Sequence, residues 1–107
     1  MAEVLTGIEE LRGRIDVIDD QLVRLLNVRV ACAVEVGKLK HEAGLPIYQP
    51  EREAQVLSSV RKAATELAGP LTAEAVVRIF ERSIDEARRA ERAASRGDEE
   101  PGPSLDE

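Results

Sequence analysis

The sequence predicts an all-α protein of three helices, and three observations lead to this fold class. Apolar residues recur at intervals of three and four in three separate segments, as they do on one face of a helix. Each of the five prolines lies at or beyond an end of such a segment, where it interrupts no helix. The chain is 43% hydrophobic but only 2% aromatic, so its core must be aliphatic, which favours packed helices over a sheet. Its 107 residues suffice for one small domain.

The first predicted helix is very long and runs from about Thr6 to Glu42. Thr6 is a suitable N-cap, and Glu9 three residues later completes a capping-box pattern. The apolar seam of this helix consists of Leu11, Ile15, Ile18, Leu22 and Leu25. A helix of about 37 residues measures roughly 55 Å, far more than an average helix. Two shorter helices cannot cover so long a seam, so a second copy of the chain is expected to cover the rest.

Two cations continue the apolar seam where Leu or Val would be expected. They are Arg29, in the middle of the helix, and Lys40, near its end. Lys40 could simply pack its stem and extend its ammonium group into water. A buried guanidinium at Arg29, in contrast, must find an anionic partner or a ligand. We therefore interpret the two cations as facing a pocket for an anion.

A second helix follows the turn GLPIYQP and begins at Pro50 or Glu51, because proline is tolerated in a first helical turn. Its apolar stripe consists of Leu57, Val60, Ala64 and Leu67. One turn before this stripe lies Glu53, with Arg52 beside it. Glu53 either stabilises the helix by lying near the positive amino end of its dipole, or accepts a hydrogen bond from a ligand hydroxyl. The segment Ala68-Gly69-Pro70-Leu71 is expected to end the helix.

The third predicted helix starts after Thr72, which is a good N-cap. Its stripe consists of Val77, Phe80, Ile84, Ala87 and then Glu91. Glu91 either faces a ligand or lies where the stripe ends in solvent. After Ala94 the sequence is acidic, contains Pro and Gly, and has no periodicity. We therefore expect a helical domain over residues 1–94 and a disordered tail over residues 95–107.

Charge and composition exclude several kinds of partner. A net charge of −6 argues against general affinity for nucleic acid or anionic membranes. The single cysteine, Cys32, and the single histidine, His41, allow neither an intrachain disulfide nor a Cys/His metal cluster. The chain contains no signal-peptide pattern and no run of 18 apolar residues. We expect a soluble, cytoplasmic protein without a metal.

If the helices pack through their stripes, the polar residues that interrupt the stripes converge. Arg12 joins this group only through a second chain, because it is 28 residues, or about 42 Å, from Lys40 along the helix. In an antiparallel pair of first helices centred near Leu22, Arg12 of one chain lies beside about residue 32 of the other. That position falls between Arg29 and Lys40, so one site could draw on both chains.

The segments LRGRIDVIDDQLVRLLNVR, AVEVGKLK and PEREAQVL resemble the all-helical chorismate mutases. These enzymes occur as small dimers and as domains fused to prephenate dehydratase or dehydrogenase. The resemblance covers about residues 5–92, and the intervals between its motifs differ from those of a generic coiled coil. It implies an intertwined homodimer with two active sites, which uses neither a metal nor an organic cofactor. The implied activity is the rearrangement of chorismate to prephenate in phenylalanine and tyrosine biosynthesis.

The resemblance also implies roles for individual residues. Arg29 and the partner subunit's Arg12 would bind the two carboxylates of chorismate. Lys40 would reach a carboxylate and the ether oxygen, and Glu53 would accept a hydrogen bond from the ring hydroxyl. Glu91 stands where family members place Gln or Glu against the ether oxygen. The reaction is an intramolecular [3,3] rearrangement, so it needs no nucleophile and depends on positioning and on stabilising charge.

Three further positions complete the implied site, and two of them depart from the family pattern. Arg52 would lie near the substrate carboxylates. Gln49 replaces an Asp that is frequent just before the second helix, and it is a poorer N-cap. Ala87 replaces a Ser or Thr that often touches a carboxylate. These departures affect the substrate more than the type of reaction, because neither removes a cation.

Two alternatives to a chorismate mutase remain open at this point. The first is another enzyme of the same structural family, an isochorismate-pyruvate lyase or a mutase acting on 4-amino-4-deoxychorismate. The second is a helical dimerisation or regulatory module without catalysis. This second alternative predicts that Arg29 and Lys40 face solvent.

Overall fold

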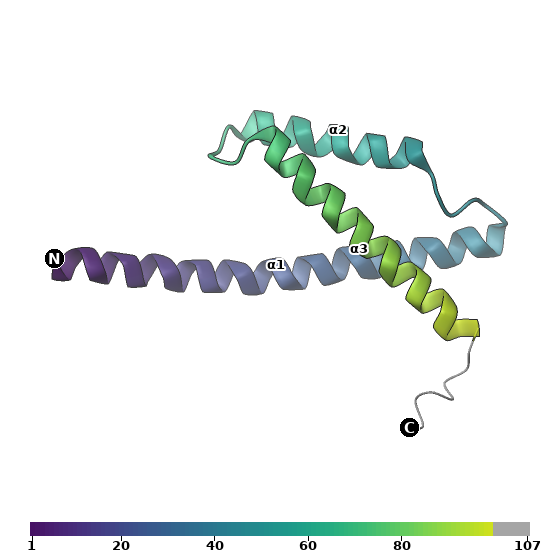
Figure 1. Cartoon of the computed structure of the whole chain (residues 1–107), viewed down its shortest axis with the longest axis horizontal. Helices are drawn as coiled ribbons and strands as arrows, with labels where there is room; N and C mark the ends of the chain where they lie inside the picture. Colours follow the sequence, from purple (N-terminus) through teal and green to yellow (C-terminus); the bar gives the residue numbers. More distant parts are fainter. Residues whose placement is uncertain (100–107) are drawn as a thin grey trace, which may run out of the picture.

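The computed structural model describes residues 1–99, with side chains through Arg96. It contains three helices, α1 (Ala2–Ala43), α2 (Pro50–Leu67) and α3 (Ala73–Glu99), and no strand in this part of the chain (Figure 1). The predicted all-α class with three helices is therefore confirmed. Among the described helices, none is both long enough and apolar enough to cross a membrane.

Helix α1 starts earlier than predicted, and Thr6 is not its N-cap. The helix begins at Ala2 after Met1, and the Leu5 amide already donates to the Met1 carbonyl at 3.0 Å. The Thr6 hydroxyl donates to the Ala2 carbonyl at 3.0 Å, so it bonds within the helix and does not cap it. At its other end, Gly44 adopts φ 69°, a left-handed conformation that glycine reaches without strain. The 42 residues of α1 make a rod of about 63 Å.

Helix α2 begins at Pro50, as predicted, and its N-cap Gln49 makes no side-chain capping bond. The stripe residues Val60 and Ala64 are half-buried. Leu67, predicted to belong to this stripe, is 81% exposed at the last helical position, so that part of the prediction is wrong. Packing of α2 therefore ends one turn before the helix does.

Helix α3 has the predicted N-cap but extends further than expected. The Thr72 hydroxyl accepts a hydrogen bond from the Ala75 amide at 3.1 Å. The helix continues to Glu99, five residues beyond the predicted boundary at Ala94. Residues 95–99 of the predicted disordered tail are therefore helical, and that part of the prediction is wrong. Residues 100–107 lie outside the described part, so a disordered tail over these residues stays a prediction.

Helix α3 holds the chain together, because it packs on both α1 and α2. In the described part of the chain, α1 and α2 do not pack on each other. The only buried apolar side chains there are Val77 and Ala87, both from the predicted α3 stripe, with Phe80 and Ile84 half-buried beside them. An ion pair between Arg61 and Glu74 joins α2 to the first turn of α3.

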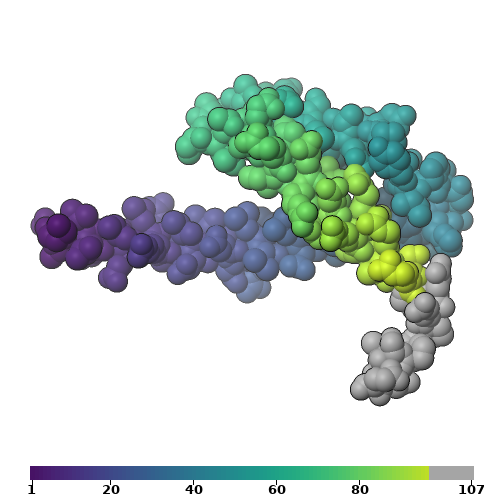
Figure 2. All heavy atoms as spheres, viewed as in Figure 1, coloured from purple at the N-terminus to yellow at the C-terminus, as the bar shows by residue number. Residues whose placement is uncertain are grey.

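The N-terminal half of α1 projects away from the other two helices. Figure 1 shows α3 crossing only the C-terminal half of α1, and in Figure 2 the purple N-terminal half stands apart as a bare rod. The seam residues Leu11, Ile15, Ile18, Leu22 and Leu25 are 48% to 65% exposed. The radius of gyration is 18.9 Å, whereas a compact chain of this length would have about 13 Å. One protomer thus leaves its longest apolar surface in solvent.

Candidate active site

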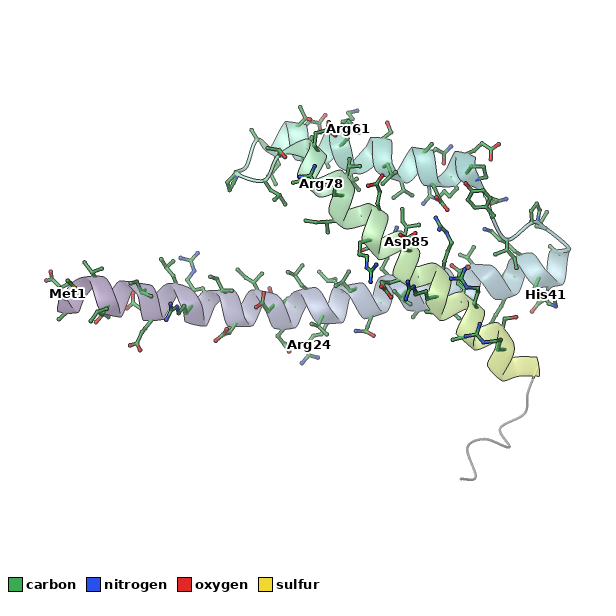
Figure 3. All side chains as sticks on the ribbon, in the orientation of Figure 1. Met1, Arg24, His41, Arg61, Arg78 and Asp85 are labelled. Atoms are coloured by element: carbon green, nitrogen blue, oxygen red, sulfur yellow. The ribbon has the colours of Figure 1, made fainter. Side chains whose placement is uncertain are left out.

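A cleft of about 990 Å³ lies between the C-terminal half of α1, the connection to α2, the start of α2 and the second half of α3. Asp85, labelled in Figure 3, lies on the stretch of α3 that borders this cleft. The predicted site residues that line the cleft are Arg29, Lys40, Gln49, Arg52, Glu53, Ala87 and Glu91. Three separate helices and the connection before α2 therefore bring together every predicted site residue except Arg12.

The two cations of the α1 seam are half-buried and face the cleft. The Arg29 guanidinium carbon lies 5.8 Å from the centroid of the Phe80 ring, a cation–π contact with α3. The Lys40 ammonium donates to the Ile47 carbonyl at 3.1 Å and has two further protons to donate. Within the described residues, neither cation forms an ion pair. This placement disagrees with the solvent-facing cations that a purely structural module predicts.

The start of α2 contributes Gln49 and Arg52. The Gln49 carbonyl accepts hydrogen bonds from the amides of Arg52 and Glu53, at 3.1 and 3.3 Å. The Arg52 guanidinium lies 3.4 Å from the side-chain oxygen of Gln55, one turn along the helix. The first turn of α2 is thus held by its backbone, which leaves the Gln49 side chain available to the cleft.

The Glu91 side chain packs against α1 at Gly37, the glycine of the VGKLK segment. A Cβ atom at Gly37 would lie 3.3 Å from Glu91 Oε1 and 3.7 Å from its Cγ and Cδ atoms. A side chain at Gly37 would therefore require the Glu91 carboxyl to shift by a few tenths of an ångström. Lys40 follows Gly37 by three residues and therefore lies on the same face of α1. The carboxyl group and the ammonium group thus border the same part of the cleft.

Ala87 is buried, with 4% of its surface exposed, and its methyl group forms part of the cleft wall. It offers no hydrogen bond to a ligand. An anion at this wall must therefore be held by the surrounding cations.

Arg88 lines the cleft and is a residue that sequence reasoning missed. Its Nη2 lies 2.6 Å from Glu53 Oε2 and its Nη1 lies 3.1 Å from Asp85 Oδ1. The guanidinium carbon lies 5.8 Å from the centroid of the Tyr48 ring, and Nε is buried without a partner among the described groups. The hydrogen bond to Glu53 raises the pKa of Arg88 above its already high ordinary value, so the side chain remains a cation. Its spacing of four from Ile84 is a signal that could have placed it beside the α3 stripe.

The cleft is strongly cationic although the chain as a whole is acidic. Seven Lys and Arg residues line it against three carboxylates, whereas the whole chain has a net charge of −6. The cations are Arg29, Lys38, Lys40, Arg52, Arg88, Arg92 and Arg96, and the carboxylates are Glu42, Glu53 and Glu91. The local field therefore favours an anionic ligand of more than one negative charge.

A single chain does not bring Arg12 to the cleft. Arg12 lies on the projecting half of α1 and is exposed. Cys32, the position expected opposite Arg12 in an antiparallel pair, does line the cleft. The expected antiparallel pair would therefore bring Arg12 of a second chain beside the lining of this cleft.

Comparison with known proteins places this architecture in a family. The family model of type II chorismate mutases matches residues 11–92. A bifunctional chorismate mutase/prephenate dehydratase of Aquifex aeolicus is 38% identical over 78 residues, which are 72% of this chain and 22% of that protein. A T-protein of Haemophilus influenzae is 36% identical over 83 residues, covering 78% of this chain and 22% of that protein.

A chorismate mutase of Methanocaldococcus jannaschii is 36% identical over 63 residues, which are 59% of this chain and 64% of that protein. The chain therefore spans about a fifth of the length of the first two relatives and under two thirds of the third. No solved structure gives a significant match. The family match covers most of the chain and includes the three helices that form the cleft, and the chain belongs to the type II chorismate mutase family.

Proposed function

We propose that this protein catalyses the rearrangement of chorismate, a small dianion, to prephenate. The observation that carries this proposal is a cationic cleft that is lined by Arg29, Lys40 and Glu91, in which neither of these two cations pairs with a described carboxylate. The reaction breaks a C–O bond and forms a C–C bond within one molecule, so the enzyme must only hold the reactive conformer and stabilise charge. We place the enzyme in the cytoplasm and in phenylalanine and tyrosine biosynthesis.

The residues of the cleft divide between binding and stabilisation of the transition state. Arg29 and the partner subunit's Arg12 hold the two carboxylates, with Arg52 at the margin of the site. Lys40 donates a hydrogen bond to the ether oxygen as that atom gains negative charge, and Glu91 in its acid form donates a second one. Gln49 and Ala87 shape the wall near the carboxylates, and Glu53 accepts from the ring hydroxyl.

Chorismate turnover by the purified protein tests this function directly. Loss of chorismate absorbance, together with identification of prephenate as the product, is the expected result. Isochorismate and 4-amino-4-deoxychorismate should be assayed in parallel, and chorismate should give the highest kcat/KM. Absence of chorismate turnover by the folded protein would contradict the proposal, and a preference for isochorismate with pyruvate release would assign it to a lyase.

The first structural prediction is that the protein is an obligate homodimer. The exposed seam centred near Leu22 needs a cover, and an antiparallel second α1 covers it while bringing Arg12 beside Cys32 of the other chain. Sedimentation at micromolar concentration should give about twice the chain mass of 11.7 kDa. A stable monomer with full activity would rule out both the covered seam and the shared site.

A second prediction concerns Gly37, which lets Glu91 approach α1. Gly37→Ala places a methyl group 3.3 Å from Glu91 Oε1 and should lower kcat severalfold by displacing the carboxyl group. The same change should stabilise the helix by up to about 1 kcal/mol, because alanine is the better helix former. Activity assays and thermal unfolding of the same sample measure both effects.

Gly13→Ala is the matched control, because nothing lies within 4 Å of a Cβ atom at that position of α1. It should raise stability by a similar amount and leave kcat unchanged. An unchanged kcat in Gly37→Ala would show that Glu91 does not depend on this contact.

A further inference from the structure

The ion pair between Arg88 and Glu53 lies inside the cleft and links α3 to α2. Both residues line the cleft, and their side chains are only 35% and 29% exposed. Asp85 and the Tyr48 ring hold the guanidinium from other sides, so its position is fixed by three neighbours. The pair is therefore a fixed part of the cleft wall, unlike the exposed ion pairs elsewhere on the helices.

This ion pair changes what Glu53 can bind. Glu53 Oε2 is occupied by Arg88 at 2.6 Å, whereas Oε1 accepts no hydrogen bond from the described residues. A neutral hydroxyl group needs only one free carboxylate oxygen, so it can donate to Oε1 without disturbing the pair. A protonated amino group would add a second cation next to Arg88 and would compete with it for a carboxylate that is already paired.

We propose that Arg88 is a specificity-determining residue, which makes the cleft select a substrate with a ring hydroxyl over one with a ring amino group. This inference rests on the proposed function, because it concerns the ring substituent of the substrate that Glu53 would contact in the cleft. Arg88 acts through the carboxylate of Glu53. The ion pair lowers the attraction of that carboxylate for a cation but leaves unchanged its ability to accept a hydrogen bond from a neutral group.

The test compares kcat/KM for chorismate and for 4-amino-4-deoxychorismate in four proteins. Wild type should prefer chorismate, and Arg88→Met should shift the ratio towards the amino substrate by about tenfold or more, where tenfold corresponds to about 1.4 kcal/mol. Methionine keeps an unbranched stem of similar length but removes the charge. Arg88→Lys restores the cation and should keep the wild-type preference. Arg89→Met, at an exposed neighbour outside the cleft lining, is the matched control and should leave the ratio unchanged.

Two outcomes would overturn the inference. One is an unchanged ratio in a folded Arg88→Met protein, which would make the ion pair only a structural link between α2 and α3. The other is a wild-type preference for the amino substrate. Dissociation constants of both compounds, measured by calorimetry on the same proteins, decide the question even without turnover. A wild type that binds with the expected selectivity but converts neither compound would contradict the proposed function and leave the inference intact.

Discussion

Arg29→Ala and Arg12→Ala should each lower chorismate turnover by more than about a hundredfold, because in the proposed site each arginine makes a charge-assisted contact to a substrate carboxylate. Both variants should remain folded dimers. Arg29→Ala removes the cation–π contact with Phe80 but leaves the buried side chains Val77 and Ala87 of α3 unchanged. Arg12 is exposed on the projecting half of α1, where it supports no packing within its own chain. Steady-state kinetics and circular dichroism of each variant check both statements.

Mixing the two inactive variants should restore activity, because a shared site needs one arginine from each chain. A heterodimer contains one site that lacks both arginines and one site that has both. Random exchange of subunits makes half of all dimers heterodimers, so about a quarter of the wild-type activity should return. Arg24→Ala is a suitable control, because Arg24 pairs with Asp20 on the exposed surface of α1 and lies outside the cleft (Figure 3). No recovery after verified subunit exchange would mean that Arg12 does not act across the interface.

The periodicity of apolar residues was sufficient to predict the helices but not their exact ends. The prediction that Val77 and Ala87 lie on the buried stripe of α3 was correct. Burial depends on spacing along a helix, and this spacing can be read directly from the sequence. The predicted start of α1 was wrong, because a threonine hydroxyl can either cap a helix or bond within one. Thr6 does the latter. Such choices depend on a few local hydrogen bonds that compete at similar energy.

Residues that line the cleft were predictable where a charge interrupted an apolar stripe. Arg29, Lys40 and Glu91 were found in this way, because a polar residue at a core position requires a reason. Arg88 was missed because it flanks the stripe and its partner Glu53 is 35 residues away in the sequence. Pairing between distant helices depends on how they cross, and periodicity within one helix carries no information about that crossing.

Glu91→Gln should raise activity at neutral pH, because the amide is a hydrogen-bond donor at every pH. A carboxylate can only accept hydrogen bonds, so ionised Glu91 would repel both the ether oxygen and the dianionic substrate. In its acid form the same group donates to that oxygen as negative charge builds there. Wild-type turnover should therefore fall as the solution changes from acid to neutral. Glu91 is half-buried and forms no ion pair with a described cation.

Rate profiles from acid to neutral pH for wild type and Glu91→Gln measure this effect. The variant should show a flat profile and exceed the wild type at neutral pH by about tenfold or more, within the range of general acid catalysis. Glu86→Gln is the matched control, because Glu86 lies on the same helix, pairs with Arg82 and is outside the cleft. It should leave the wild-type profile unchanged. A flat wild-type profile that Glu91→Gln does not alter would mean that Glu91 does not donate to the substrate, and the ether oxygen would then receive its second hydrogen bond from another group in the cleft.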